Sequence, residues 1–308
     1  MVSNPSAAPH PDADRAAHAR TIGFICAALG ALGFSFKAIF VKAAYRYGVD
    51  AETLLCLRMA YALPLLCLMA LALERHKPAT LTRHDWQELF VLGLLGYYLA
   101  SYLDFLGLRY ISAALERIVM FVYPTLVAVL SALFLGKALT RRTALLLLWS
   151  YVGVALAVAP DLRFAAGNTL LGVALVFGSA LSYAIYLMRS GPTALRLGST
   201  RVTAYGTGIA CVLCVLQFIL LRPLGALAQP WPVHALALAM SVFSTVLPIW
   251  LFTEAVRRMG APNASMIGSL GPIFTILLAY ALLHEPVSAV QLAGAAVVIV
   301  AVSQLTRR

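Results

Sequence analysis

Six charged side chains interrupt the long apolar stretches in the first part of this chain. A charged side chain near the centre of a bilayer costs about 3 kcal/mol on insertion scales, so such residues face a protein interior or an opposite charge. Four cations and two carboxylates sum to +2. The set therefore predicts either a structural ion-pair network or a gate and substrate site suited to a carboxylate, and the two are compatible. Its members are Lys37, Lys42, Arg58, Asp104, Glu116 and Arg117.

Hydroxyl and aromatic side chains recur at helical spacing in four segments. Residues three, four and seven positions apart lie on one face of a helix. Such faces are also ordinary packing surfaces between membrane helices, but four together predict a central polar cavity. The faces are Tyr97, Ser101 and Asp104; Ser112, Glu116 and Tyr123; Ser179, Ser182, Tyr183 and Tyr186; and Ser241, Ser244, Thr245 and Pro248.

Two prolines, Pro124 and Pro272, lie in corresponding parts of two apolar segments. Proline bends a helix and frees a backbone carbonyl, and paired interruptions indicate a transport site or hinge. Prolines are also simply tolerated in membrane helices, which is the other interpretation. With these two as hinges, the predicted substrate pathway or gate comprises Lys37, Arg58, Tyr97, Ser101, Asp104, Glu116, Arg117, Tyr123, Ser179, Ser182, Tyr183, Tyr186, Ser244 and Thr245.

The composition excludes a water-soluble globule. Hydrophobic residues make up 62% of the chain and charged residues 11%, and the mean hydropathy is +0.88. Soluble domains have about 25% charged residues. The apolar runs are long enough for membrane helices, which need about 20 residues. The sequence predicts an all-α integral membrane protein with ten transmembrane helices, at roughly 21–45, 53–73, 86–106, 111–135, 143–160, 168–189, 200–221, 233–256, 263–283 and 287–305.

The basic residues predict the orientation. With a cytoplasmic N-terminus, fifteen Lys and Arg residues fall in inner segments and four in outer ones, as the positive-inside rule requires. Both termini are then cytoplasmic, and residues 1–20 form a flexible tail. The net charge of +11 is spread over these inner segments, which argues against a nucleic-acid partner.

The last part of the chain repeats its middle. At a shift of 148 residues, Pro124 falls on Pro272 and Lys137 on Glu285. At a shift of 149, Lys37 becomes the counterpart of Tyr186. Five helices in each half place the second half upside down relative to the first. We therefore expect a 5+5 inverted-topology repeat, with residues 21–160 as the first unit and 168–305 as the second.

The motif GLRYISAALERIVMFVYPTLVAVLSALFLGK, residues 107–137, resembles the first EamA domain of the drug/metabolite transporter superfamily. GSLGPIFTILLAYALLHEPVSAVQLAGAAVVIVAVS, residues 268–303, resembles the second, including its His-Glu-Pro turn. The first half departs from the pattern in having Lys137 where an acidic residue is commoner. The resemblance implies ten helices, an inverted repeat and secondary transport, often export of amino acids or related metabolites, and leaves the substrate open.

We therefore expect a secondary transporter that exports small metabolites such as amino acids across a bacterial inner membrane by alternating access. Proton coupling through Glu116 or Asp104 and facilitated diffusion both fit the residues. The alternatives are a non-transporting receptor or scaffold and, less favoured, a membrane enzyme, for which we find no catalytic motif. No Walker A motif is present, and we expect no cofactor. Cys211 and Cys214 lack a second Cys or His pair, so we expect no metal site.

Overall fold

The computed structural model describes residues 11–135, 141–164, 168–259, 267 and 270–306. Within these ranges the chain forms helices and no strand. The helices are α1 (Pro11–Tyr45), α2 (Ala51–His76), α3 (Arg83–Gly93), η1 (Leu94–Leu99), α4 (Ala100–Gly107), α5 (Ala113–Met120), α6 (Tyr123–Leu135), α7 (Arg141–Phe164), α8 (Thr169–Leu197), α9 (Ser199–Leu221), η2 (Leu224–Leu227), α10 (Trp231–Ser241), η3 (Val242–Val246), α11 (Leu247–Met259), α13 (Gly271–Leu278), η4 (Ala279–Leu283) and α14 (Ala289–Thr306).

These helices confirm the prediction of an all-helical membrane protein. Seven described helices are long and apolar enough to cross a bilayer, and three shorter apolar helices lie where the fifth, ninth and tenth spans were predicted. The count of ten transmembrane helices stays a prediction. The seven are Thr21–Tyr45, Ala51–His76, Arg83–Gly107, Ala113–Phe134, Thr169–Ser190, Thr200–Leu221 and Trp231–Phe252, and the shorter ones are Ala144–Ala157, Gly271–Leu283 and Ala289–Ala301.

Local signals explain where several helices begin. The side chain of Asp50 accepts a hydrogen bond from the Thr53 amide (2.9 Å) and so caps α2. Thr82 and Asp85 form a reciprocal capping box at the start of α3. The first helix begins at Pro11, within the segment predicted as a flexible tail. Residues 11–20 continue the helix because they are rich in alanine, the best helix former.

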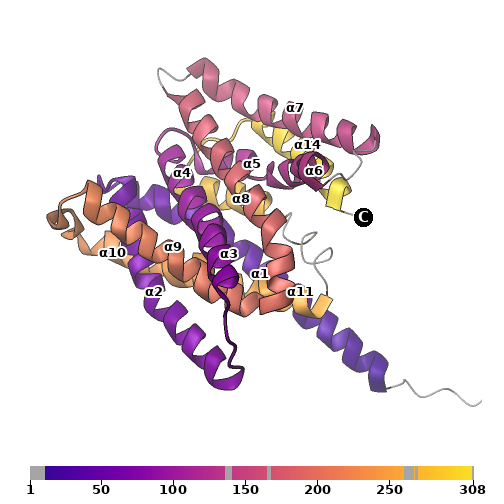
Figure 1. Ribbon diagram of the computed structural model, residues 1–308. Coiled ribbons are helices and arrows are strands. Elements are labelled where there is room, and N and C mark those ends of the chain that lie inside the picture. The colour runs from indigo at the N-terminus through magenta and orange to yellow at the C-terminus, as the bar shows by residue number, and fades with distance from the viewer. Residues whose placement is uncertain (1–10, 136–140, 165–167, 260–266, 268–269, 307–308) are drawn as a thin grey trace, which may run out of the picture.

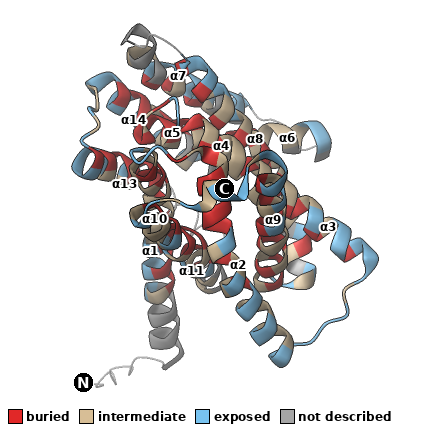
Figure 2. Cartoon of the chain, turned by 90° about the vertical axis from the view of Figure 1, so that its left-hand side faces the viewer, coloured by how far each residue is buried: buried red, intermediate tan, exposed pale blue. Residues whose placement is uncertain are grey.

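The helices pack as pairs that are distant in the sequence. Helix α1 packs against α11, α2 against α9, and α4 against α8. Helices α7 and α14 lie side by side at one edge of the molecule (Figure 1). Buried residues concentrate where the helices face one another, and the outer faces are mostly exposed (Figure 2). The exposed outer faces carry many large apolar side chains, such as Leu133, Leu220 and Trp231, as expected for a surface in contact with lipid.

Three close contacts between helices recur at a shift of 148 or 149 residues. In one set, a glycine lies so close to the facing helix that an added Cβ would be 2.4–3.3 Å from a backbone oxygen of that helix. In the other, a serine hydroxyl at the corresponding position donates a hydrogen bond of 2.6–2.8 Å to the corresponding carbonyl. The equivalent contacts are Gly30 to Pro248 and Ser179 to Ala100, Gly33 to Phe243 and Ser182 to Leu95, and Gly93 to Gly206 and Ser241 to Arg58.

Candidate functional site

A cavity of about 320 Å³ lies among the helices of both halves. All of the predicted pathway residues except Glu116 and Ser182 line it. The Ser182 hydroxyl donates a hydrogen bond to the Leu95 carbonyl (2.8 Å). The predicted residues in the lining are Lys37, Arg58, Tyr97, Ser101, Asp104, Arg117, Tyr123, Ser179, Tyr183, Tyr186, Ser244 and Thr245.

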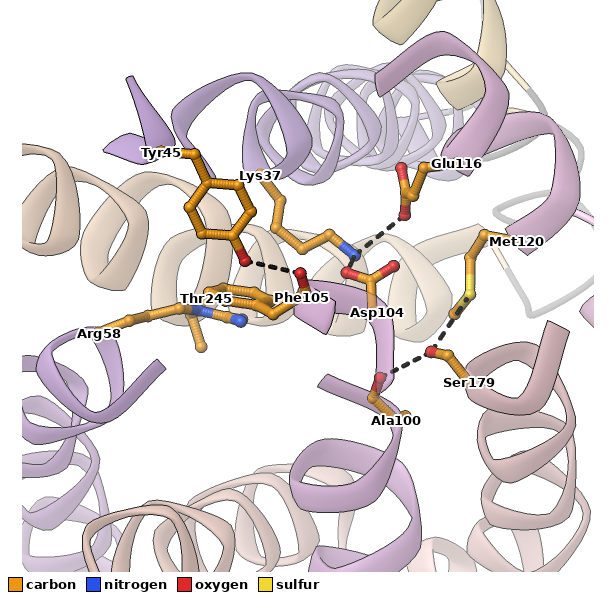
Figure 3. Close-up of polar contacts among 10 residues, drawn as sticks. All are labelled: Lys37, Tyr45, Arg58, Ala100, Asp104, Phe105, Glu116, Met120, Ser179 and Thr245. Carbon is orange, nitrogen blue, oxygen red and sulfur yellow. Dashed lines mark hydrogen bonds and ion pairs between the residues drawn. The ribbon is translucent and has the colours of Figure 1, made fainter. Parts of the chain in front are cut away.

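The Lys37 ammonium lies between two carboxylates at one side of this cavity. Its Nζ is 2.7 Å from Asp104 Oδ2 and 3.4 Å from Glu116 Oε1, and Figure 3 shows the side chain pointing toward both. Asp104 and Glu116 are buried, whereas Lys37 is partly exposed to the cavity. One ammonium is thus shared by a pair of buried carboxylates contributed by α4 and α5. We call these three residues the Lys37 cluster.

Arg58 is buried on α2 and is held in place from two sides. Its Nε donates a hydrogen bond to Thr245 Oγ1 (3.0 Å), and its guanidinium lies 5.3 Å from the centre of the Phe105 ring. Figure 3 shows the guanidinium beside this ring. Its Nη1 has no hydrogen-bond partner among the described residues. A buried donor without a partner is costly, so this nitrogen has an unmet requirement for a hydrogen-bond acceptor.

Arg117 reaches the same cavity from α5. Among the described residues it makes no ion pair or hydrogen bond, and its buried Nε is unsatisfied. Gly271 makes room for it, because a Cβ at that position would lie 2.7 Å from Arg117 Nη2. The second half of the chain therefore provides the space into which this first-half guanidinium extends.

Four tyrosines form a continuous aromatic wall of the cavity. Tyr123 and Tyr183 meet edge to face with centroids 5.1 Å apart, Tyr183 stacks on Tyr186 at 5.5 Å, and Tyr186 meets Tyr97 edge to face at 5.3 Å. The hydroxyls of Tyr97 and Tyr186 are 3.2 Å apart. Because two of these residues come from each half, the wall crosses the boundary between the halves.

The two predicted hinge prolines lie at helix beginnings. Pro124 is the second residue of α6, and Pro272 the second residue of α13. The segment predicted as one span over 111–135 is accordingly divided between α5 and α6. Proline is favoured in the first turn of a helix, where its missing N–H is not needed. Their action as hinges stays a prediction.

A second, smaller cavity of about 270 Å³ lies near the turns that follow α1 and η4. Its lining includes Lys42, Arg46, Arg109 and Glu285. The Glu285 carboxylate accepts a hydrogen bond from the Ala113 amide (3.0 Å) at the start of α5. Burial raises the pKa of Glu285, and nearby Lys42 partly opposes this shift. Lys137, the predicted repeat counterpart of Glu285, lies outside the described residues.

Some lining residues were not predicted from the sequence. Ser190 extends the face of Tyr183 and Tyr186 by one further turn, so the same helical spacing would have found it. Phe252 is the counterpart of Asp104 at a shift of 148 residues, so the repeat would have indicated it. Phe34 lies three residues before Lys37 and so shares its helix face, and it also lines the cavity.

The sequence model of the EamA-like transporter family matches this chain twice, over residues 21–159 and 170–307. The chain belongs to the EamA-like transporter family. This result confirms the resemblance seen in the two motifs and fits the drug/metabolite transporter superfamily. The family is one of transporters, in agreement with the expectation that the chain is not an enzyme.

Named relatives of this EamA-like chain are also transporters. The uncharacterized transporter YcbK of Bacillus subtilis (strain 168) is 29% identical over 276 residues, which cover 88% of each chain. An uncharacterized transporter of Archaeoglobus fulgidus is 27% identical over 261 residues, or 84% of this chain and 88% of the relative. One solved structure superposes with a TM-score of 0.61 at 18% identity, covering 94% of this chain and 97% of the other. That likeness concerns the fold alone.

Proposed function

We propose that this EamA-like protein exports small metabolites, such as amino acids, by alternating access across a bacterial inner membrane, with both termini in the cytoplasm. We call the end with residues 46–50 and 284–288 the outer end, and the end with the Gly198 turn the inner end. These names follow from the charge bias of the sequence.

The observation that carries this proposal is a cavity whose lining, among the described residues, extends to the inner end and is bordered by ion pairs on its other side. Its lining extends to Ser190, Ala194 and Thr203, which flank the Gly198 turn between α8 and α9. Toward the outer end, the Lys37 cluster borders the cavity. A substrate in the cavity would therefore reach the inner end more readily than the outer end.

Further contacts close the outer end. The Tyr45 hydroxyl donates a hydrogen bond to the Phe105 carbonyl (2.6 Å), and Arg46 Nη2 donates one to the Leu283 carbonyl (2.9 Å). Beyond them lies the smaller cavity with Lys42 and Glu285. Two cavities on opposite sides of a set of ion pairs and hydrogen bonds are the arrangement that alternating access requires, because breaking those contacts would join the substrate site to the other side.

The packing of the helices supports an inverted repeat. The pairing of α1 with α11 corresponds to that of α8 with α4, and the pairing of α3 with α9 to that of α10 with α2. The glycine and serine contacts described above exchange partners between the halves in the same way. Two such halves can rock against each other about a site at their boundary. We take residues 21–160 and 168–305 as the two units.

The Lys37 cluster also bears on the energy source. Two carboxylates share one ammonium, so taking up a proton on Asp104 or Glu116 would weaken the ion pairs that border the cavity. A proton bound from one side could thus favour opening of the outer end. Facilitated diffusion along the substrate gradient would use the same contacts without net proton movement.

Flux into proteoliposomes tests the function. The purified protein should accumulate or release at least one radiolabelled amino acid or related carboxylate from a metabolite panel, with and without an imposed pH gradient. A variant with Gly93→Leu, which cannot pack α3 against α9, serves as the inactive control. Binding without flux for every compound would favour a receptor or scaffold instead.

A further inference from the structure

The charges around the central cavity are not equivalent, because some already lie beside an opposite charge within the protein. The Lys37 ammonium is shared by Asp104 and Glu116. Arg58 and Arg117 line the cavity without an ion pair among the described residues, and each has an unsatisfied buried nitrogen. Three cations less two carboxylates leave a formal charge of +1. The surplus therefore belongs to the guanidinium groups and not to Lys37.

We infer, building on the proposed transport function, that Arg117 with Arg58 binds the carboxylate of the substrate, and that a substrate amino group is dispensable. Guanidinium groups form paired, charge-assisted hydrogen bonds to carboxylates. An ammonium group would need a carboxylate of its own. Glu116 does not line the cavity, and Asp104, which does, is paired with Lys37 at 2.7 Å. The site thus takes small organic carboxylates, with or without an amine.

The rest of the cavity wall indicates the chemistry of the remainder of the substrate. Tyr97, Tyr123, Tyr183 and Tyr186 present aromatic rings from both halves. Aromatic rings stack on flat apolar groups and meet them edge to face. Phe34 and Phe252, which meet edge to face with centroids 6.4 Å apart, extend this apolar wall. A carboxylate carried on an aromatic body fits both sets of residues.

The test measures binding without transport, so that it can fail separately from the proposed function. Thermal stabilisation of the detergent-purified protein is titrated with phenylalanine, 3-phenylpropionate, phenylalaninamide and hexanoate. We expect both aromatic carboxylates to stabilise the protein with similar apparent affinity. Phenylalaninamide, which has the amine but no carboxylate, should bind about tenfold more weakly or not at all. Hexanoate should bind more weakly than 3-phenylpropionate.

Two variants locate the binding site. Arg117→Gln should weaken 3-phenylpropionate binding about tenfold, and Arg117→Lys should recover part of it. Arg109→Gln, at the outer end, serves as the matched control and should leave the titration unchanged. Equal binding of the amide, or absence of stabilisation by 3-phenylpropionate in the unmodified protein, would overturn the inference. So would unchanged binding in Arg117→Gln. Binding as expected, with no flux of any compound in proteoliposomes, would overturn the transport proposal and leave the carboxylate site standing.

Discussion

The two halves of this protein bring their helices together by different means at equivalent positions. The first half uses glycines, where any side chain would meet the facing backbone, and the second uses serines, whose hydroxyls donate to that backbone. Both solutions hold two helices at a short distance. The glycines have no side chain to keep the helices apart. The serines use the side chain as a hydrogen-bond donor, which is favourable in the membrane interior. The backbone arrangement is therefore shared, although few residues are.

The same comparison of the two halves shows how the charged residues of the cavity are distributed between them. Lys37, Arg58 and Asp104 of the first half correspond to Tyr186, Gly206 and Phe252 of the second. Among the described residues, the charged side chains that line the cavity all come from the first half, whereas both halves contribute rings and hydroxyls. The two repeats therefore share the aromatic wall of the cavity but not its charges.

The largest expected effect comes from removing the cation of the charged half. Lys37→Met leaves two buried carboxylates without a partner, and breaking a buried ion pair from one side costs about 3–5 kcal/mol. We expect a corresponding loss of stability in denaturation from mixed micelles, and loss of transport. Its second-half counterpart, Tyr186→Phe, keeps the ring and removes the hydroxyl that contacts Tyr97, so it should cost about 1 kcal/mol.

A triple variant sharpens this test. Combining Lys37→Met with Asp104→Asn and Glu116→Gln removes the unpaired charges and should restore most of the lost stability without restoring transport. If Lys37→Met alone is as stable as the parent, the cluster does not hold the first half together, and the difference in charge between the two halves has no effect on stability.

A second, smaller effect separates the glycine contacts from the serine contacts. A Cβ added at Gly93 would lie 2.4 Å from the Gly206 oxygen, so Gly93→Ala should lower the unfolding free energy by about 1–3 kcal/mol. At the equivalent position, Ser241→Ala adds no atoms and removes a hydroxyl that donates to the Arg58 and Ala237 carbonyls, which should cost about 1 kcal/mol.

Gly208→Ala is the control for these two variants. No atom lies within 4 Å of a Cβ added there, so alanine should leave stability unchanged or raise it by up to about 1 kcal/mol. Similar losses for Gly93→Ala and Gly208→Ala would mean that close helix approach is not what the first-half glycines provide.

The smallest expected effect concerns the carboxylate that joins the halves at the outer end. Since burial raises the pKa of Glu285 above 4.5, its stabilising contribution is full below that value and declines as the pH rises through the raised pKa. Glu285→Gln mimics the protonated form and should therefore melt at least as high as the parent near pH 8, with a difference that vanishes near pH 4. Glu285→Ala removes the acceptor at the start of α5 and should cost about 1 kcal/mol. A parent protein that becomes more stable than Glu285→Gln at high pH would contradict this sign.

Much of the architecture could be predicted without coordinates. Long apolar runs can only be helices in a bilayer, because backbone groups find no water there, and the helical order of the predicted spans follows from this. The helical spacing of the polar and aromatic residues likewise predicted which side chains face the cavity for most of its lining, for example Tyr183 and Tyr186. Glu116 and Ser182 were placed on polar faces too, but one is held within the Lys37 cluster and the other bonds to a backbone carbonyl.

Pairing could not be predicted in the same way. Composition and spacing specified that charges inside the membrane must meet partners, since an isolated charge is costly there, and they specified which residues were available. Which cation neutralises which carboxylate depends on how helices distant in the sequence pack. Only that packing assigned Asp104 and Glu116 to Lys37 and left Arg58 and Arg117 facing the cavity. Hydrophobicity and periodicity are properties of each segment by itself, whereas the distribution of charge over a binding site is a property of the contacts between segments.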